Sequence, residues 1–191
     1  VLAIFAVADT IKESSRSAIA ELHRLGVVSV MLTGDNVATA GAIAQQAGID
    51  DARGNLLPED KLAAIEELRE RYGATAMTGD GINDAPALAR ADIGVAMGAA
   101  GTDTAMEAAD IVIMNDNLQR IPETIRLSRR THAVLWQNIS LALGIKIVFL
   151  GLALFGSATM WMAVFADMGA SLLVVANGLR MLRTSAPQTK D

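Results

Sequence analysis

The most informative run of this sequence is Thr78-Gly79-Asp80-Gly81-Ile82-Asn83-Asp84-Ala85-Pro86. It follows the short apolar segment 74–77 and carries two carboxylates, Asp80 and Asp84, around a turn. Glycine on each side of Asp80 lets the backbone turn sharply and leaves room for an anion. Carboxylate oxygens on such a turn suit Mg²⁺, which prefers oxygen ligands and commonly bridges protein to phosphate. Taken alone, the run is equally compatible with an acidic loop between a strand and a helix.

Strand-like and helical segments alternate on both sides of this run. Short strands are predicted for the apolar segments 1–8, 27–32, 74–77, 93–96 and 110–114. Helices are predicted over 14–25, 37–47 and 58–72, since Gly26 and Gly48 can end the first two and Pro58 can begin the third. This alternation predicts an α/β domain around a mainly parallel, Rossmann-type sheet.

Two polar runs follow predicted strands, at the edge of a parallel sheet where ligands bind. They are Thr33-Gly34-Asp35 and Gly79-Asp80-Gly81. We expect Thr33 to donate a hydrogen bond to a phosphoryl oxygen and Lys61 to neutralise its charge. Asp80 would hold Mg²⁺, with Asn83 and Asp84 fixing the turn. Taken singly, Thr33 is also compatible with a helix N-cap or a turn, and Lys61 with an ordinary surface lysine.

A covalent nucleophile is not obvious in the sequence. Asp9 ends a predicted strand, but the run Asp9-Thr10-Ile11-Lys12 is more typical of a cap on the following helix. If phosphoryl chemistry occurs here, its covalent centre is expected in another part of a longer protein. The chain begins with Val1 rather than Met, which also reads as a piece of something longer.

Charge is distributed unevenly along the chain. Residues 1–130 hold 19 acidic and 12 basic side chains, whereas between Ala133 and Leu179 only Lys146 and Asp167 are charged. The 47 residues of that apolar stretch are enough for two helical spans of roughly 20 residues each. Spans are predicted near 137–155 and 160–182, with a turn at 156–159. The arginines that flank them predict two cytoplasmic ends, by the positive-inside rule.

Lys146 and Asp167 each lie about ten residues from that turn. At ~1.5 Å per residue both are expected ~15 Å from it, near the middle of a ~30 Å hydrocarbon layer. A charge at that depth costs about 2.5–3.5 kcal/mol even on a lenient scale. A hairpin salt bridge is the structural explanation, and an ion path with Asp167 as ligand and Lys146 as counter-charge is the functional one. The functional explanation is preferred, because a hairpin is more stable without either charge.

The soluble motifs together resemble the P-type ATPases. The resemblance rests on Thr33-Gly34-Asp35-Asn36, on Lys61 after Pro58-Glu59-Asp60, and on the run from Thr78 to Pro86. It extends through Met97-Gly98, Gly101-Thr102-Asp103 and Ala109-Asp110 toward the apolar stretch. It implies the later part of a phosphorylation domain with a haloacid-dehalogenase-like fold, followed by the last two transmembrane helices of the heavy-metal-transporting branch. Lys146 with Asp167-Met168-Gly169 resembles the zinc/cadmium/lead exporters, and the signatures expected of copper and cobalt pumps are not found.

The resemblance implies a role for each matching residue. Thr33, Gly34, Asp35, Lys61 and Asn83 would belong to the phosphoryl site, Asp80 and Asp84 to the Mg²⁺ site, and Asp167 and Lys146 to the transport site. The implied cofactors are Mg²⁺ and ATP, and the transported ion is Zn²⁺, Cd²⁺ or Pb²⁺. The family's phosphorylated aspartate, nucleotide-binding domain, actuator loop and Cys-Pro-Cys helix are not in the sequence. The isolated chain is therefore expected to be inactive without the rest of the pump.

The predicted organisation is a soluble domain over 1–130, a transmembrane hairpin over 131–183 and a cytoplasmic tail over 184–191. The expected location is the plasma (inner) membrane, with the lipid bilayer as a partner. A net charge of −5 argues against nucleic acid as a partner, and the absence of cysteine excludes thiolate ligands within the chain. Two alternatives remain open: a Mg²⁺-dependent haloacid-dehalogenase-type phosphatase anchored by the hairpin, with Asp9 as nucleophile, and a non-catalytic pump tail that binds an intact partner.

Overall fold

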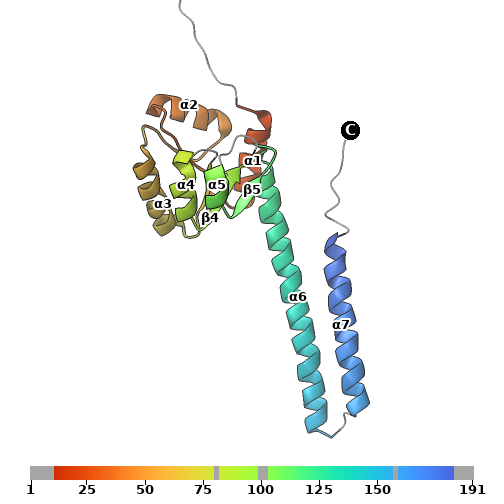
Figure 1. Ribbon diagram of the computed structural model, residues 1–191. Helices are drawn as coiled ribbons and strands as arrows, with labels where there is room; N and C mark the ends of the chain where they lie inside the picture. The colour runs from red at the N-terminus through yellow and green to blue at the C-terminus, as the bar shows by residue number, and fades with distance from the viewer. Residues whose placement is uncertain (1–10, 80–81, 99–102, 157–158, 183–191) are drawn as a thin grey trace, which may run out of the picture. The chain divides into compact units, whose positions relative to one another are not determined.

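The computed structural model describes residues 11–79, 82–98, 103–156 and 159–182. The chain divides into two compact units, Val1–Glu123 and Thr124–Asp191, and each is described by itself (Figure 1). The predicted strand 1–8, together with Asp9, Asp80 and Gly81, lies outside the described residues. The predicted limits 1–130, 131–183 and 184–191 stay predictions.

The first unit alternates helices with short strands, as the sequence predicts. Its helices are α1 (Glu13–Arg24), α2 (Val37–Ala47), α3 (Pro58–Tyr72), α4 (Ala85–Arg90) and α5 (Asp103–Ala108), with a 3₁₀ turn η1 (Ile82–Asp84) before α4. Its strands are β1 (Val30–Leu32), β2 (Asp51–Arg53), β3 (Ala76–Gly79), β4 (Ile93–Met97) and β5 (Ile111–Ile113). The predicted helices 37–47 and 58–72 have the same bounds as α2 and α3. The sequence did not predict β2, α4 or α5.

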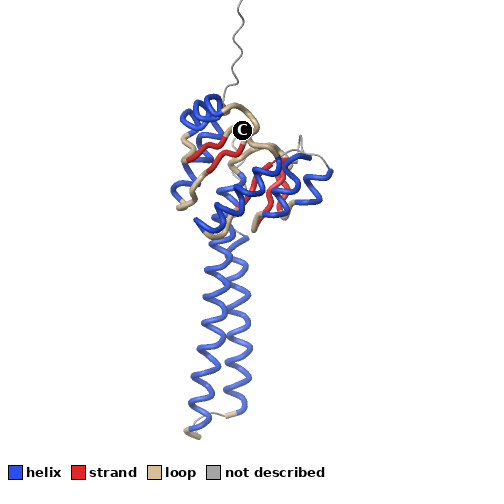
Figure 2. Tube along the Cα trace, turned by 90° about the vertical axis from the view of Figure 1, so that its left-hand side faces the viewer, coloured by secondary structure: helices blue, strands red, loops and turns tan. Residues whose placement is uncertain are grey.

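All described strand pairs are parallel, but they form two sheets instead of the one expected (Figure 2). The first sheet pairs β1 with β2, placing Val30 opposite Asp51. The second has the order β3-β4-β5, with Ala76 opposite Ile93 and Val95 opposite Ile111. Within the described residues, β1 and β3 therefore each pair on one side only.

A small apolar core joins the two sheets. Its buried members are Ile65 of α3, Met77 of β3, and Ala87 and Leu88 of α4. Leu32, the last residue of β1, packs against this cluster from the other sheet. The carboxyl ends of β1 and β3 are thus held in one compact unit, and each is followed by a polar run that the sequence analysis singles out.

The second unit contains two long apolar helices that lie side by side, α6 (Arg120–Leu154) and α7 (Met160–Leu182), of which α6 begins in the first unit (Figure 1). By length and composition, both are able to cross a membrane. Helix α6 is continuous over 35 residues, so the predicted span 137–155 coincides with its C-terminal half. The predicted span 160–182 has the bounds of α7. The expected fold class, a parallel α/β domain followed by an apolar helical pair, is confirmed.

Candidate functional site

The threonine of the first polar run is held by its own loop. Thr33 follows the last residue of β1, and its hydroxyl donates to Asp35 Oδ2 over 3.0 Å while accepting the Asp35 backbone N–H over 3.1 Å. Helix α2 is capped by Asn36, whose Oδ1 accepts the Thr39 N–H over 2.8 Å. Thr33 is therefore not the N-cap of this helix, and the N-cap alternative for it is wrong. Gly34 and Asp35 are exposed beside it.

A close backbone approach holds this loop against the segment that leads into α3. The Asn55 N–H donates to the Asp35 carbonyl over 2.6 Å, and the Leu56 N–H donates to the Thr33 carbonyl over 3.1 Å. A Cβ atom at Gly54 would lie only 2.7 Å from the Asp35 carbonyl oxygen, so this approach requires glycine. The backbone thereby fixes the Thr33 loop relative to the start of α3.

Lys61 lies in the first turns of α3 and is paired with Asp84. Its Nζ is 2.7 Å from Asp84 Oδ1, and the two side chains are only 16% and 14% exposed. Helix α3 begins with Pro58, and the Asp60 carboxylate accepts the Leu57 N–H over 2.9 Å, which fixes the start of the helix. A largely buried, paired lysine is not an ordinary surface lysine. Removing either partner would leave an uncompensated charge.

Asp84 rests directly against the end of β3. A Cβ atom at Gly79 would lie 2.7 Å from Asp84 Cβ and 2.9 Å from Asp84 Oδ2. Only glycine allows the η1 turn to bring this carboxylate so close to the strand end. Asn83, in the same turn, is exposed. The predicted ligand Asp80 falls outside the described residues.

The described part of the chain does not by itself assemble a Mg²⁺ site. No group of three or more His, Asp or Glu side chains suited to a metal occurs among the described residues. One oxygen of Asp84 accepts a hydrogen bond from Lys61 Nζ, so this carboxylate positions the lysine. No described hydrogen bond links the Thr33–Asp35 pair to the Lys61–Asp84 pair. The structure thus brings Lys61 and Asp84 together. It places Thr33 directly after β1, in the other sheet of the same unit.

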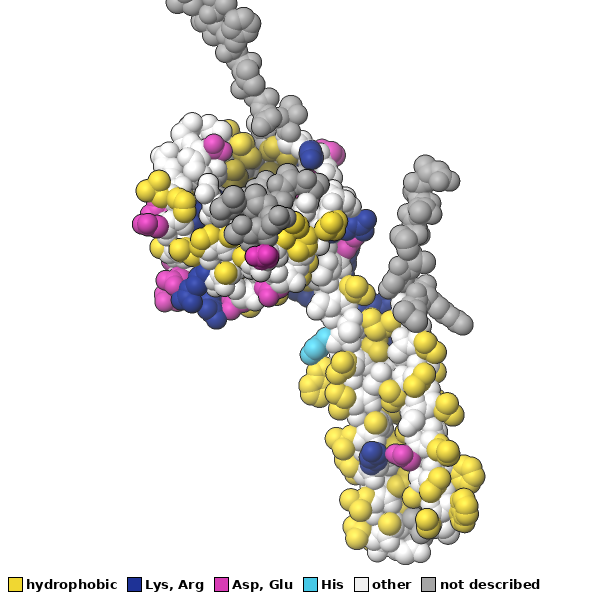
Figure 3. Space-filling model, in the orientation of Figure 1, with side chains coloured by type: hydrophobic (Ala, Val, Ile, Leu, Met, Phe, Trp, Pro, Cys, Tyr) yellow, Lys and Arg dark blue, Asp and Glu magenta, His cyan; other side chains and the backbone are white. Residues whose placement is uncertain are grey.

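The two intramembrane charges predicted from the sequence meet across the helical pair. Lys146 Nζ of α6 lies 3.8 Å from Asp167 Oδ1 of α7, and both side chains are 69% exposed. Figure 3 shows one basic and one acidic side chain next to each other on the otherwise apolar helical pair. A cavity of ≈ 150 Å³ adjoins them, with apolar walls formed by Ile145, Phe149, Ala163, Ala166 and Ala170. The carboxylate and the ammonium both line this cavity.

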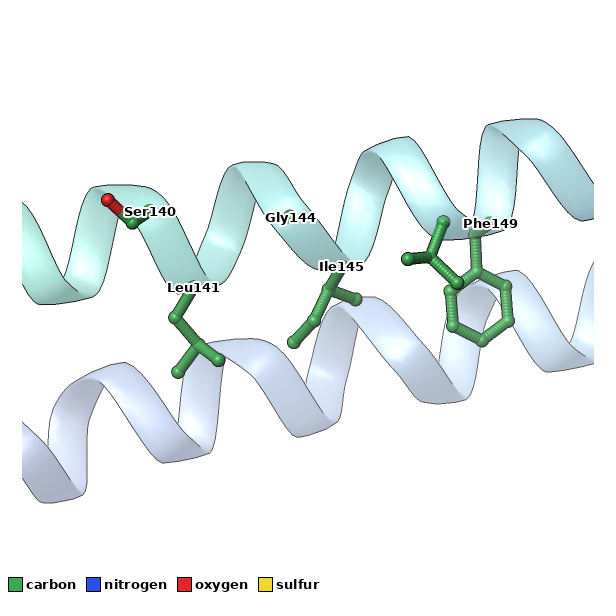
Figure 4. A pocket seen from close by; sticks show the side chains of 6 residues that line it. Ser140, Leu141, Gly144, Ile145 and Phe149 are labelled. Carbon is green, nitrogen blue, oxygen red and sulfur yellow. The ribbon is translucent and has the colours of Figure 1, made fainter.

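A second hollow, of ≈ 320 Å³, runs along α6 (Figure 4). It is lined by Ser140, Leu141, Gly144, Ile145, Val148 and Phe149. Ser140 is the one side chain with a polar group among these residues. We therefore place no ion in this hollow.

Sequence reasoning missed a cluster around Asp50. The Ser29 N–H donates to Asp50 Oδ2 over 2.7 Å, the Ser29 hydroxyl donates over 3.0 Å, and His23 Nε2 lies 2.8 Å away. The Ser29 backbone N–H, aided by its hydroxyl and by His23, holds the pKa of Asp50 below its ordinary value, against the opposing effect of burial. These contacts tie the end of α1 to both strands of the first sheet. A lone histidine without a motif gave no signal for them.

A second unpredicted contact joins β2 to α3. The Arg53 guanidinium makes a bidentate pair with Glu67, with distances of 2.7 and 2.9 Å. This pairing raises the pKa of Arg53 and lowers the pKa of Glu67. It fixes α3, and hence Lys61, relative to the first sheet.

Comparisons with known proteins find relatives for both units. Residues 1–92 match the family model described as "Hydrolase: haloacid dehalogenase-like hydrolase". The chain is 52% identical to a probable cadmium-transporting ATPase of Listeria monocytogenes, covering 95% of this chain and 26% of that protein. It is 49% identical to the zinc/cadmium/lead-transporting P-type ATPase of Escherichia coli, covering 96% and 25% respectively. The chain thus spans about a quarter of the length of the curated relatives it matches.

A solved structure agrees over both units. The crystal structure of a zinc-transporting PIB-type ATPase in the E2·Pi state is 48% identical to this chain and superposes with a TM-score of 0.84. The match covers 91% of this chain and 28% of that one. Over nearly its whole length the chain is similar in sequence to P-type ATPases named for cadmium and zinc transport, and in sequence and fold to a zinc-transporting PIB-type ATPase.

Proposed function

We propose that this chain is the part of an ATP-driven pump that handles phosphate and lines the ion path for Zn²⁺, Cd²⁺ or Pb²⁺. The observation that carries the proposal is the Lys146–Asp167 pair on two apolar helices, in a chain whose other unit has a haloacid-dehalogenase-like fold. Relatives named as cadmium- and zinc-transporting ATPases support it.

On the phosphate side, Lys61 supplies positive charge and Asp84 holds it in place. The Thr33 hydroxyl, which donates to Asp35 in this structure, is the donor for a phosphoryl oxygen once phosphate is present. Gly34, Asp35 and Asn83 are the proposed neighbours of that phosphate. Asp80 would hold Mg²⁺ beside Asp84, and bound Mg²⁺ would neutralise phosphate charge. Such preoriented charges and donors lower the barrier without reorganisation during the reaction.

On the membrane side, Asp167 binds the transported divalent ion. Lys146 is its counter-charge when the ion is absent, since an unpaired carboxylate is costly in hydrocarbon. A divalent cation at Asp167 and the Lys146 ammonium repel each other at so short a separation. Ion binding therefore displaces Lys146, and its return favours release.

The remaining assignments follow from the same proposal. The working protein is an integral membrane pump, with both ends of this segment in the cytoplasm and the plasma (inner) membrane as its location. Its ATP is bound mainly by the rest of the pump, which also carries the phosphorylated aspartate. An anchored phosphatase is not favoured, because a simple anchor gains nothing from charges on apolar helices.

The proposal predicts ATP-dependent uptake of Cd²⁺ or Zn²⁺ into inverted vesicles that contain the full-length parent. Removing one charge-stabilising group typically costs roughly 10²–10³ in kcat, so Lys61→Ala should lower uptake by about that factor. Lys12→Ala is the matched control, because Lys12 is exposed and makes no side-chain capping bond at α1. No uptake by the unaltered parent, or equal uptake by both variants, would overturn the proposal.

A further inference from the structure

An amide pair bridges the two apolar helices away from the ion pair. Asn177 Nδ2 of α7 donates to Asn138 Oδ1 of α6 over 2.8 Å and lies 3.5 Å from Gln137 Oε1. Both asparagines are half-buried, whereas Lys146 and Asp167 are largely exposed. A directional contact therefore lies inside the packed face of the hairpin, and the ion pair lies at its edge.

The amide pair and the ion pair both belong to one antiparallel register of α6 and α7. Asn138 precedes Lys146 by eight residues on α6, and Asn177 follows Asp167 by ten residues on α7. At 1.5 Å per residue these spacings are ~12 and ~15 Å, so a single register of the helices satisfies both contacts. Any slip that breaks the amide pair also changes the depth of Asp167 relative to Lys146.

The rest of the packed face gives little information about register. On α6 the buried and half-buried side chains around Asn138 are Val134, Ala142 and Ile145, and on α7 those preceding Asn177 are Ala166, Ala170 and Val174. These residues recur about once per helical turn and are small or apolar. Sliding α7 by one turn would replace each such contact by a similar one.

The amide pair has no such replacement. A shift of one turn in either direction would place Leu173 or Met181 where Asn177 now meets Asn138, leaving two amides unpaired in an apolar setting. It would also move Asp167 by ~5.4 Å along the helix axis, beyond contact with Lys146. A single polar residue in an apolar helix interface is a known means of fixing register.

We propose that Asn138 and Asn177 are positioning residues: their hydrogen bond sets the register of α6 against α7 and so holds the Asp167 carboxylate at the depth of Lys146. The register itself depends only on the amide pair. Its consequence for ion binding rests on the proposed function.

Cysteine cross-linking of the whole chain in lipid vesicles tests the register directly, because the chain contains no cysteine of its own. Ile145→Cys is combined in turn with Ala166→Cys, Ala170→Cys and Val174→Cys, which follow one another at intervals of about one helical turn. We expect the Ala170→Cys pair to cross-link best. Adding Asn177→Leu should lower the cross-linking yield of this pair, relative to the yields of the other two pairs, by about threefold or more. This factor follows from the strength of interhelical hydrogen bonds in membranes.

Two further variants make the result decisive. Asn177→Gln keeps an amide and should restore the original pattern, and Ser140→Leu, an exposed change on α6, should leave it unaltered. An unchanged pattern with Asn177→Leu, or a loss that Asn177→Gln does not recover, would overturn the proposal.

A second measurement separates this proposal from the proposed function. In the full-length parent, Asn177→Leu should raise the Cd²⁺ concentration for half-maximal ATPase activity much more than it lowers kcat. A parent without metal activation would refute the proposed function and leave the cross-linking result standing. A shifted register with unaltered metal activation would refute the positioning of Asp167.

Discussion

At the scale of single residues, the Lys61–Asp84 pair depends on the absence of a side chain at Gly79. A Cβ atom there would lie 2.7 Å from Asp84 Cβ, which has little freedom to move. Gly79→Ala should therefore displace Asp84 and lower ATP turnover of the full-length parent by about tenfold or more, as loss of positioning commonly does.

Gly41→Ala is the matched control for that change. Gly41 lies within α2, and nothing is within 4 Å of a Cβ added there. Alanine should leave turnover unaltered and raise the unfolding free energy by up to about 1 kcal/mol, the difference in helix propensity. Equal turnover in the Gly79→Ala and Gly41→Ala variants would contradict the role assigned to Gly79.

The Asp50 cluster should make the first sheet sensitive to acid. The pKa of Asp50 is lowered in the folded state, so its contribution to stability is complete above the unfolded value and is lost as the pH falls through the folded one. That window lies below about pH 4, the ordinary range of an aspartate. The hydrogen-exchange protection of the Ser29 amide in the parent should fall there.

Asp50→Ala tests the same contact at neutral pH. It should lower Ser29 protection by roughly three- to tenfold, the effect of a hydrogen bond worth about 1 kcal/mol. It should also remove the fall in protection below about pH 4. Protection that keeps its acid dependence in this variant would show that another group is responsible.

The sequence predicted the residues whose chemistry is local and missed those whose partners are distant. Lys61 stood out through its place at the start of a helix, and Thr33 through its place after a strand. The pairing of Lys61 with Asp84 spans 23 positions and depends on the fit at Gly79, which no local pattern encodes. His23, Ser29 and Asp50 were missed for the same reason.

At the scale of elements, β1 and β3 each have one edge that no other described strand pairs with. Among the described strands, β1 pairs only with β2 and β3 only with β4. The resemblance implies that a strand carrying the phosphorylated aspartate fills the gap between them.

Residues 1–130 expressed alone should then unfold over a broad temperature range, without a cooperative calorimetric transition. A segment of the parent that includes the preceding strand should melt cooperatively. A sharp transition in the short segment would contradict this account.

Helix prediction succeeded where the ends carry strong signals. Helix α2 has Asn36 as its cap and ends at Gly48, whose φ of 77° favours glycine, and α3 begins at Pro58. Strand β2 is three residues long and reads Asp-Ala-Arg, which has no apolar pattern. It forms because tertiary contacts hold it, among them the Arg53–Glu67 pair, so the sequence alone could not predict it.

At the scale of the whole molecule, the unit proposed to handle phosphate is followed by two apolar helices, and within the stretch 133–179 each helix carries one charge. The composition shift after residue 130 predicted the helical pair, and the positions of Lys146 and Asp167 predicted their meeting. The amide pair of Asn138 and Asn177 was not predicted, since register between two apolar helices cannot be obtained from either helix alone.

The most direct test of the central claim is metal-stimulated ATP hydrolysis by the full-length parent in membranes. Zn²⁺, Cd²⁺, Pb²⁺, Co²⁺ and Cu⁺ are compared for the unaltered protein, for Asp167→Ala, and for Leu172→Ala as an exposed control on α7. We expect stimulation by Zn²⁺, Cd²⁺ or Pb²⁺ that is lost in Asp167→Ala and retained in Leu172→Ala. Stimulation by Cu⁺, or stimulation indifferent to Asp167, would contradict the central claim.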